Sequence, residues 1–175
     1  MEERVILVDK NDLEIGTEEK LQAHKQGKLH RSFGILVFNS KNELMLQKRH
    51  SSKYHSGGLW TNTCCSHPRP GEKTLEAAHR RLKEEMGFDC ELKEAFTFSY
   101  NVKFDNGLYE NEFYHIFIGY SEQEPKFNPE EAEDWKWMGL QDIATDMSKN
   151  PGSYTHWFKL TIPKAIAYLA ATTKE

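Results

Sequence analysis

The side chains best suited to chemistry are concentrated in residues 60–87, which carry cysteines, histidines, basic residues and several acids. Within this stretch Cys65 and His67 are separated by one residue, and Pro68 follows His67 directly. Proline disfavours the helical conformation for the residue before it, which favours an extended backbone at His67. Alternate side chains of an extended segment point to the same side. The sequence therefore predicts that a thiol and an imidazole face one cavity.

A helix is predicted directly after this segment, because apolar residues recur at helical spacing and Gly87 supplies the residue type that commonly ends a helix. The apolar stripe of this helix consists of Leu75, Ala78, Leu82 and Met86. On the same helical wheel Glu85 flanks the stripe, whereas Glu84 points roughly opposite it. Glu85 is therefore the carboxylate that we expect to look inward.

Two further acids lie in residues 108–120, which are predicted to form a strand. Glu110 and Glu112 share one face of it with Tyr114 and Ile116, and a rise of about 3.3 Å per residue separates the two acids by about 7 Å along the strand. Acids that face inward among apolar neighbours are costly unless they are paired or bound to a metal. The alternative is an edge strand whose acids lie in water.

A loop rich in basic side chains precedes the cysteine segment and carries Arg49, His50, Lys53 and His55. Such a loop commonly contacts only solvent. This one leads into the cysteine segment beside the helix that bears Arg81, and converging guanidinium and ammonium groups bind anions well. We therefore expect a bound anion between the loop and the helix.

Two more histidines, His24 and His30, lie along a short predicted helix that is broken at Gly27. By itself such a pair is most often surface decoration. Combined with the residues above it completes a set of three imidazoles and two carboxylates, namely His24, His30, His67, Glu110 and Glu112. That ligand set suits a divalent transition metal.

Residues 66–88 resemble the Nudix box, whose pattern is G-x5-E-x7-R-E-U-x-E-E-x-G-U, where U is an aliphatic or apolar residue. The positions that follow its spacing are Ser66, Glu72, Arg80, Leu82, Glu84, Glu85, Gly87 and Phe88. Ser66 replaces the leading glycine of the box, and Arg81 replaces the glutamate after its arginine. Loss of that glutamate weakens the case for the pyrophosphate hydrolysis that is usual in the family.

The segment from Thr61 to Pro68 more specifically resembles the T-N-x-x-C-x-H-P pattern of type I isopentenyl diphosphate isomerases. The resemblance covers nearly the whole chain and includes His24, His30, Arg49, Lys53, Glu110 and Glu112. It implies an enzyme, an isopentenyl diphosphate delta-isomerase, that interconverts isopentenyl and dimethylallyl diphosphate in isoprenoid precursor biosynthesis. The reaction moves a carbon-carbon double bond.

The same resemblance assigns roles on two sides of the substrate. Protonation of the alkene makes a tertiary carbocation, so the site needs a proton donor, a base, electron-rich walls and no loose water. By family analogy Cys65 lies at one face of the substrate, and Glu112, assisted by Tyr100, lies at the other. Trp157 lies against the cation. Which of Cys65 and Glu112 donates the first proton is left open.

Two metal sites are implied by the resemblance. The three histidines with Glu110 and Glu112 hold one divalent ion, for which Mn²⁺, Zn²⁺ and Mg²⁺ stay as alternatives. Glu85 fits a Mg²⁺ ion that bridges the protein and the diphosphate. Direct contacts to the diphosphate are expected from Lys20, Arg49, Lys53 and Arg81.

Two other classes of protein stay open. A Nudix pyrophosphohydrolase would share the fold and the Mg²⁺ dependence, but it would not need Cys65 or the histidine set. A metal-stabilised binding module without catalysis would explain the histidines and Cys65 structurally, but it leaves the basic loop and Glu85 without a role. The products separate these classes, since a hydrolase releases phosphate or a nucleoside monophosphate.

These residues require a fold that brings distant segments together. The pattern along the chain predicts an α+β domain, and the resemblance implies a single Nudix-type domain with mixed β-sheets packed between helices. Strands are expected at residues 5–8, 32–38, 44–49, 63–67, 90–95, 96–104, 108–120 and 135–138, with a turn at 105–107. Helices are expected from residue 17, at 75–86, at 140–147 and at 154–171. Residues 121–134, which are acidic and carry two prolines, are expected to form an exposed loop.

The composition limits the partners of the chain. Its 175 residues fit one domain, residues 1–175. A net charge of -4 argues against nucleic acid or an anionic membrane as the main partner, so we expect a small-molecule diphosphate. Three cysteines and no apolar N-terminal run indicate a cytoplasmic protein. We expect a monomer or a weak homodimer.

Overall fold

The fold is built around one strand, β3 (His30–Phe38), in the computed structural model, which describes residues 3–172. β3 pairs in parallel with β8 (Tyr109–Tyr120), and antiparallel with β1 (Arg4–Val8), β4 (Glu43–Arg49) and β6 (Cys64–Ser66). β3 has partners on both edges and is covered on both faces, which suits the continuous apolar run from Phe33 to Phe38.

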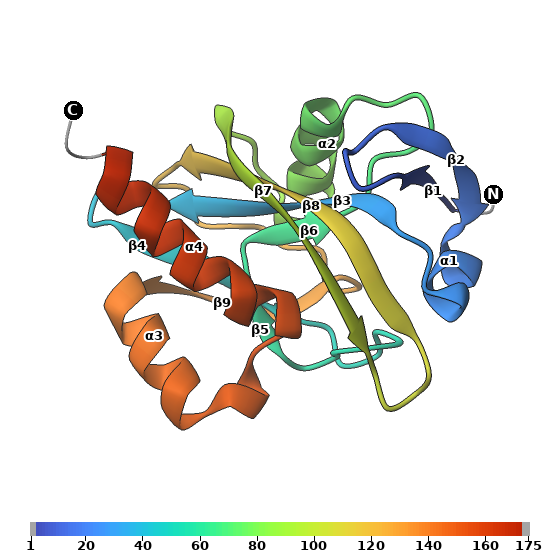
Figure 1. Cartoon of the computed structure of the whole chain (residues 1–175). Helices are drawn as coiled ribbons and strands as arrows, with labels where there is room; N and C mark the ends of the chain where they lie inside the picture. The colour runs from blue at the N-terminus through green and yellow to red at the C-terminus, as the bar shows by residue number, and fades with distance from the viewer. Residues whose placement is uncertain (1–2, 173–175) are drawn as a thin grey trace.

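Four more strands complete a mixed sheet of nine strands within the described residues: β2 (Glu14–Glu19), β5 (Trp60–Thr61), β7 (Leu92–Lys103) and β9 (Ala132–Gly139). β2 pairs with β1, β7 with β8, and both β5 and β9 with β4, all antiparallel. Figure 1 shows β7 and β8 as two long strands side by side. Their connection turns at residues 105–107, as the sequence predicts.

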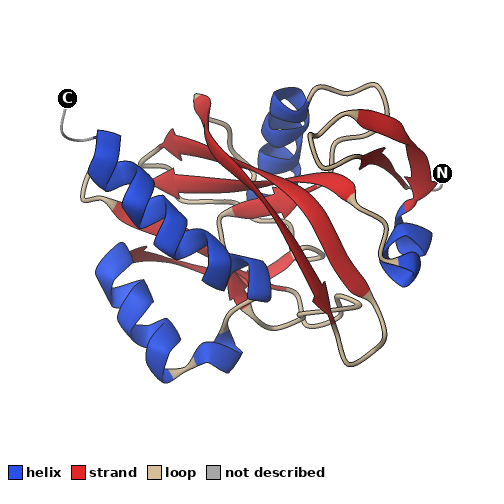
Figure 2. Ribbon diagram, viewed as in Figure 1, coloured by secondary structure: helices blue, strands red, loops and turns tan. Residues whose placement is uncertain are grey.

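The sheet lies between helices (Figure 2). On one side is α2 (Thr74–Met86), and on the other are α3 (Leu140–Lys149) and α4 (His156–Thr172). The short α1 (Lys20–Gln26) connects β2 to β3, and the 3-10 helix η1 (Pro151–Ser153) leads into α4. The expected α+β class, with a mixed sheet between helices, is therefore confirmed.

Alternation along β3 sends its side chains into two hydrophobic cores. Leu36 and Phe38 belong to the core that includes Phe158 of α4, whereas Ile35 and Val37 belong to the core that includes residues of α2. Each core buries one face of the sheet, and apolar burial is the main favourable contribution to folding. The sheet is thereby held as a rigid support for side chains at its edges.

Helix α2 follows the predicted stripe except at its start. Ala78, Leu82 and Met86 are fully buried, and the helix ends at Gly87, whose φ of 74° suits glycine. Leu75, in contrast, is 42% exposed, so the stripe does not extend to the first turn. Glu85 is buried, as its place on the helical wheel predicts.

The expected helix start at residue 17 is wrong. Residues 17–19 continue β2, because they pair with β1. The helix α1 begins only at Lys20, where the Glu19 carboxylate accepts hydrogen bonds from the backbone N–H groups of Leu21 and Gln22. An acid at this position satisfies the first free donors of the helix.

Three other boundaries also differ from the expectation. The two strands expected within residues 90–104 are one strand, β7, with an irregularity in its register between Glu94 and Phe96. Residues 132–134 belong to β9, because they pair with β4, and not to an exposed loop. The last helix begins at His156. Local composition does not reveal strand pairing of this kind.

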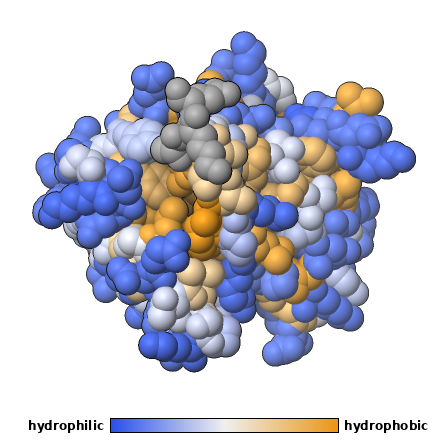
Figure 3. Space-filling model, turned by 60° about the vertical axis from the view of Figure 1, so that its left-hand side comes forward, coloured by the Kyte–Doolittle hydropathy of each residue, from blue (hydrophilic) through white to orange (hydrophobic). Residues whose placement is uncertain are grey.

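The surface is mainly hydrophilic on the face turned to the viewer in Figure 3, with apolar side chains gathered near the middle of that face. Within residues 3–172, no helix combines the length and the apolar character needed to cross a membrane.

Candidate active site

One cavity gathers most of the residues that the sequence singles out for chemistry. Its wall includes Lys20, Arg49, Lys53, Cys65, His67, Arg81, Glu85, Tyr100, Glu110, Glu112 and Trp157. His24 and His30 are fully buried next to His67, whose ring centroid lies 5.7 Å from that of His24 and 5.0 Å from that of His30. The fold therefore brings together residues from segments as far apart as α1 and α4.

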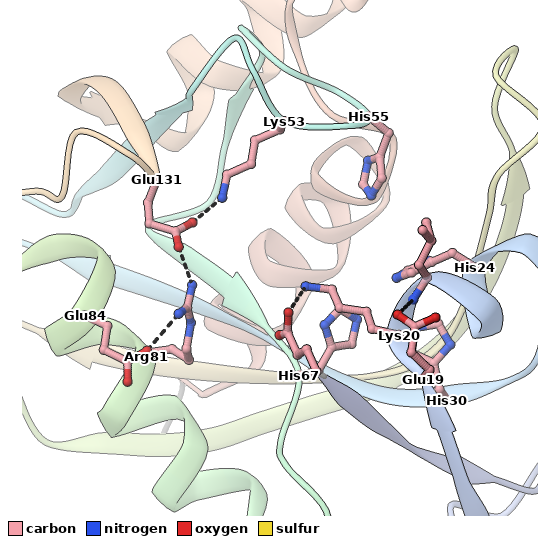
Figure 4. A network of polar contacts seen from close by, with 12 residues as sticks. Glu19, Lys20, His24, His30, Lys53, His55, His67, Arg81, Glu84 and Glu131 are labelled. Atoms are coloured by element: carbon pink, nitrogen blue, oxygen red, sulfur yellow. Dashed lines mark hydrogen bonds and ion pairs between the residues drawn. The ribbon is translucent and has the colours of Figure 1, made fainter. Parts of the chain in front are cut away.

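Backbone carbonyls hold the rings of His24 and His30. His24 lies in the last turn of α1, and its Nδ1 donates to the Tyr109 carbonyl at 2.8 Å. His30 begins β3, so its expected place along the short helix is wrong; its Nδ1 donates to the Lys28 carbonyl at 2.8 Å. The nitrogen that donates carries the proton, so Nε2 of each ring presents a lone pair. Figure 4 shows these rings gathered with that of His67.

The three imidazoles have the form and the geometry of metal ligands. His24 Nε2, His30 Nε2 and His67 Nδ1 are buried and have no hydrogen-bond partner among the described residues. These histidines and Glu110 offer ligand atoms that all lie within 4.8 Å of one another. Burial lowers the pKa of His24 and of His67 to about 4, so both are neutral near pH 7. The residues present therefore fit a divalent transition metal.

Strand pairing places Glu112 at the centre of this group. Glu112 lies opposite His30 in the β3 and β8 pair and opposite Tyr100 in the β7 and β8 pair. The hydroxyls of Tyr100 and Ser32 donate to Glu112 Oε2 at 2.6 Å and 2.7 Å. The other oxygen, Oε1, lies 2.9 Å from His67 Nε2 and 3.5 Å from His30 Nε2. Both oxygens are thus held in defined directions.

Glu110 and Glu112 share this buried space, but their pKa values move in opposite directions. Burial and the charge of Glu112 raise the pKa of Glu110 well above its ordinary value. At Glu112 burial also acts to raise the pKa, but contacts with His30 and His67 outweigh it and hold the pKa well below the ordinary value. Glu112 therefore carries a negative charge near pH 7.

The two neighbouring cysteines of β6 face opposite sides of the sheet. Cys64 is fully buried in the core beneath α2, whereas Cys65 lines the cavity together with His67, as strand alternation predicts. Burial raises the pKa of the Cys65 thiol to about 12, so the sulfur keeps its proton near pH 7. Arg49 Nη1 lies 3.9 Å from Cys65 Sγ.

The other part of the cavity holds cations that are already paired with carboxylates. Arg81 of α2 donates to Glu85 Oε1 at 2.6 Å and to Glu131 Oε1 at 3.2 Å, and Lys53 donates to the other oxygen of Glu131 (Figure 4). Lys20 Nζ lies 3.1 Å from a carboxylate oxygen of Glu3. An anion that binds here must therefore compete with the carboxylates that already pair with these cations.

Arg49 differs from these cations, because it has no carboxylate partner among the described residues. Its Nη2 donates to the His55 carbonyl at 3.4 Å, and its guanidinium carbon lies 5.2 Å from the ring centroid of Trp157. Its Nε is buried without a hydrogen-bond partner among residues 3–172. Among Arg49, Lys20, Lys53 and Arg81, Arg49 is thus the cation that no carboxylate of the described residues neutralises.

Glu85 offers a second place for a cation. The side chain is 4% exposed, its Oε1 accepts from Arg81 and its Oε2 accepts from Gln47 Nε2 at 3.0 Å. Mg²⁺ in proteins takes one or two carboxylates together with phosphate oxygens. A carboxylate that lines the cavity among cations suited to phosphate fits that requirement.

Glu131 and His55 line the cavity, although the sequence predicts no role in the site for either of them. The exposed loop expected at residues 121–134 is wrong for Glu131, which is half-buried and pairs with Lys53 and Arg81. His55 was noted only as part of a basic loop, yet its Nε2 lies 2.7 Å from Glu110 Oε1. Both contacts join segments far apart in the chain, so no spacing in the sequence signals them.

The sequence is similar to known proteins over nearly its whole length. Residues 28–158 match the NUDIX domain family. Over 167 residues the chain is 52% identical to isopentenyl-diphosphate Delta-isomerase 2 of Aromatoleum aromaticum, covering 95% of this chain and 88% of that protein. It is 47% identical over 171 residues to the isopentenyl-diphosphate Delta-isomerase of Pectobacterium atrosepticum, covering 98% of this chain and 96% of that protein.

Solved structures share the fold at low sequence identity. The crystal structure of a Deinococcus radiodurans protein matches with a TM-score of 0.77 and 18% identity, covering 93% of this chain and 98% of that one. The MutT protein of Methanosarcina mazei matches with a TM-score of 0.66 and 19% identity, covering 78% of this chain and 91% of that one. At such identities the likeness concerns the fold alone.

Proposed function

The chain belongs to the isopentenyl-diphosphate Delta-isomerase family within the Nudix superfamily, and we propose that it converts isopentenyl diphosphate to dimethylallyl diphosphate through a tertiary carbocation. The observation that carries this proposal is that Cys65 and Glu112 line one cavity with cations suited to a diphosphate. The product is a precursor for isoprenoid synthesis. Each group that lines this cavity has a separate role in the proposed reaction.

Cys65 is the proton donor in the direction of dimethylallyl diphosphate. Its thiol is protonated near pH 7, because burial raises its pKa to about 12. The S–H bond breaks as a C–H bond forms at the terminal alkene carbon, which leaves a thiolate and a tertiary cation. Arg49 Nη1, at 3.9 Å from Sγ, stabilises the thiolate.

Glu112 is the base that removes the proton from the neighbouring methylene. It carries a negative charge, and Tyr100 and Ser32 hold its Oε2 by hydrogen bonds of 2.6 Å and 2.7 Å. A base held in position loses little entropy on the way to the transition state. Return of the proton from Glu112 to the thiolate, through solvent after product leaves, restores the starting state.

His24, His30, His67 and Glu110, whose ligand atoms lie together, would hold a divalent metal, for which Mn²⁺, Zn²⁺ and Mg²⁺ stay as alternatives. Glu112, which lies against His67, would be a further carboxylate ligand. When bound, this ion supplies positive charge that orients the two carboxylates and offsets their mutual repulsion. The buried imidazoles keep their free ring nitrogens directed at that place, because backbone carbonyls fix the rings of His24 and His30.

The diphosphate is bound by Arg49, Lys53, Arg81 and Lys20, together with a Mg²⁺ ion held by Glu85. Arg81 separates this function from hydrolysis. Where the Nudix box has a glutamate, this chain has a cation that pairs with Glu85 at 2.6 Å. A guanidinium there holds a diphosphate and cannot act as the carboxylate ligand that activates water.

Aromatic walls protect the cation from water. Trp157 is 4% exposed and Tyr100 is 8% exposed, and both line the cavity. The ring face of Trp157 stabilises a nearby positive charge through its quadrupole. Exclusion of water prevents capture of the cation as an alcohol.

Incubation with isopentenyl diphosphate, Mg²⁺ and Mn²⁺, followed by proton and phosphorus NMR, tests the proposal. We expect dimethylallyl diphosphate without free phosphate, and in D₂O deuterium at the carbon that receives the proton. Phosphate release without dimethylallyl product would instead support a Nudix hydrolase. Metal binding without any product would support a binding module.

We also propose that the enzyme acts in the cytoplasm on this small-molecule substrate, without nucleic acid or membrane as a partner, as a monomer or a weak homodimer. The net charge of -4 supports the absence of a polyanionic partner. Size-exclusion chromatography with light scattering at several protein concentrations tests the expected mass.

A further inference from the structure

The cavity has two parts. The metal part consists of His24, His30, His67, Glu110 and Glu112, and the anion part consists of Lys20, Arg49, Lys53, Arg81 and Glu85. His55 belongs to neither set, but it contacts both parts. It lies in the loop between β4 and β5, residues 50–59, which also carries Lys53. The side chain is 6% exposed, so it is buried in spite of its place in a loop. Buried polar atoms are normally hydrogen-bonded, so the ring nitrogens of a buried histidine are expected to have partners.

The side chain of His55 reaches the metal part. Its Nε2 lies 2.7 Å from Glu110 Oε1, a distance that requires polar attraction between the two atoms. The ring stacks on Phe104 with centroids 4.8 Å apart and meets the edge of Trp157 at 5.8 Å. These aromatic contacts fix the plane of the imidazole, and so the direction from which it approaches Glu110.

His55 is placed to act on a metal ligand and not as one. The group of ligand atoms within 4.8 Å of one another consists of His24, His30, His67 and Glu110. The ring centroid of His55 lies 6.0 Å from that of His24. At 2.7 Å from Glu110 Oε1, the Nε2 atom of His55 is placed to present an N–H to the Glu110 carboxylate.

The backbone of His55 reaches the anion part. Its carbonyl accepts a hydrogen bond from Arg49 Nη2 at 3.4 Å. Lys53, which pairs with Glu131, lies in the same loop. One residue therefore touches a metal ligand with its side chain and an anion-binding cation with its main chain.

We propose that His55 is a positioning residue that couples the metal part to the anion part: it orients Glu110 for metal binding, and metal binding in turn orders the loop that carries Lys53. The inference rests on the metal site proposed above. Outer partners of metal ligands fix ligand orientation and commonly change metal affinity by 10 to 100-fold. By linkage, an interaction that favours metal binding through this loop must also make the metal favour the ordered loop.

The test measures Mn²⁺ binding by calorimetry, and hydrogen exchange of the amides of residues 50–58, in the full-length protein without any diphosphate. Loop exchange is informative because the proposed metal ligands all lie outside residues 50–58. Four proteins are compared: the wild type, His55→Phe, His55→Gln and the control His50→Phe. His55→Phe keeps the aromatic packing and removes the nitrogen. His55→Gln restores an N–H near the position of Nε2.

His50→Phe is the matched control, since it makes the same chemical change in the same loop. The His50 ring contacts Ser52 and no residue of the metal part. We expect Mn²⁺ to slow loop exchange several-fold in the wild type and in His50→Phe. In His55→Phe the metal should bind about tenfold more weakly and leave loop exchange unchanged, and His55→Gln should recover part of both effects.

Equal Mn²⁺ affinity and equal metal-dependent protection in the wild type and His55→Phe would overturn the coupling. Loss of all Mn²⁺ binding in His55→Phe, with a native circular dichroism spectrum, would make His55 a ligand and overturn the positioning role. If the wild type binds no Mn²⁺, the metal site fails and the coupling fails with it. Isomerase activity in the wild type separates these results from a failure of the proposed reaction.

Discussion

The metal part and the anion part of the cavity differ in how their polar groups are satisfied before substrate arrives. In the metal part, His24, His30 and His67 each leave a buried ring nitrogen without a partner among the described residues. In the anion part, Arg81 and Lys53 share the carboxylate of Glu131, and Arg81 also pairs with Glu85. The metal part therefore presents unpaired ligand atoms, whereas Arg81 and Lys53 of the anion part are already paired with carboxylates.

Because their polar groups differ in this way, the two parts are expected to bind their ligands differently. A metal ion gains contacts in the first part without displacing any protein group from the three imidazoles. A diphosphate must compete with Glu131 in the second part, so part of its binding energy replaces ion pairs that already exist. Arg49 is the exception, since it lacks a carboxylate partner within residues 3–172. Substitutions that affect only one part test whether the metal and the diphosphate bind in these different ways.

The largest effect on turnover is expected at Cys65, whose sulfur binds neither the metal nor the diphosphate. Cys65→Ala should lower the turnover rate by about 1000-fold, because it removes a general acid, and should leave diphosphate affinity nearly unchanged. Steady-state kinetics and equilibrium binding measure the two quantities. Cys64→Ala is the control, since Cys64 faces the opposite core, and its activity should be close to that of the wild type. Similar losses in both variants would contradict the assignment.

The metal part should fail as a unit when one imidazole is removed. His67→Ala should lose metal and with it about 100-fold in activity, because the remaining ligands are left unpaired in a buried site. Metal content by mass spectrometry gives the direct measurement. His79→Ala is a matched control, since His79 pairs with Asp89 away from the cavity. Full metal occupancy in His67→Ala would contradict the assignment of His67 as a metal ligand.

The anion part should respond unevenly to the loss of its cations. Arg49→Gln should raise the Michaelis constant by about 100-fold, because no internal carboxylate is released to offset the loss. Lys53→Gln should raise it by about tenfold, and Lys53→Gln with Glu131→Gln by less than that, since removal of Glu131 leaves no unpaired acid. Initial rates over a range of substrate concentrations decide this. Equal effects at Arg49 and Lys53 would break the comparison.

Trp157 tests whether the wall between the two parts stabilises charge. A cation over an indole face in a desolvated site gains about 2 kcal/mol, which is roughly 30-fold in rate. Trp157→Leu should lower turnover by about that factor and leave the Michaelis constant little changed. An inhibitor with an ammonium group at the cationic carbon should lose affinity in parallel, and a neutral analogue should not. Equal losses for both analogues would mean that Trp157 only packs the core.

The smallest effect concerns the stability of the metal-free protein. The pKa of His24 is lowered to about 4 in the folded state, and in the unfolded chain it is about 6.5. Between these values the unfolded state binds the proton and the folded state does not, so the free energy of unfolding falls as pH drops from 7 to 5, by about 1 to 2 kcal/mol for this group. Denaturant unfolding with chelator should show a weaker pH dependence in His24→Asn. An identical slope in both proteins would contradict the buried neutral state.

Much of the site follows from the sequence alone, because local backbone geometry decides which side chains share a face. The period of an extended strand separates Cys65 from Cys64 and puts Glu110 and Glu112 on one side, and the period of a helix turns Glu85 inward. These relations hold within one element, so they need no knowledge of its neighbours. The same reasoning misjudges Leu75, because exposure depends on what lies against the first turn of α2.

The contacts between distant segments were decided only by the tertiary structure. The pairing of β3 and β7 with β8 brings His30 and Tyr100 opposite Glu112, and the return of the chain into β9 brings Glu131 between Lys53 and Arg81. The loop after β4 buries His55 against Glu110. Strand register and loop packing depend on the sum of many side-chain contacts across the sheet, and no local pattern of residue types encodes that sum.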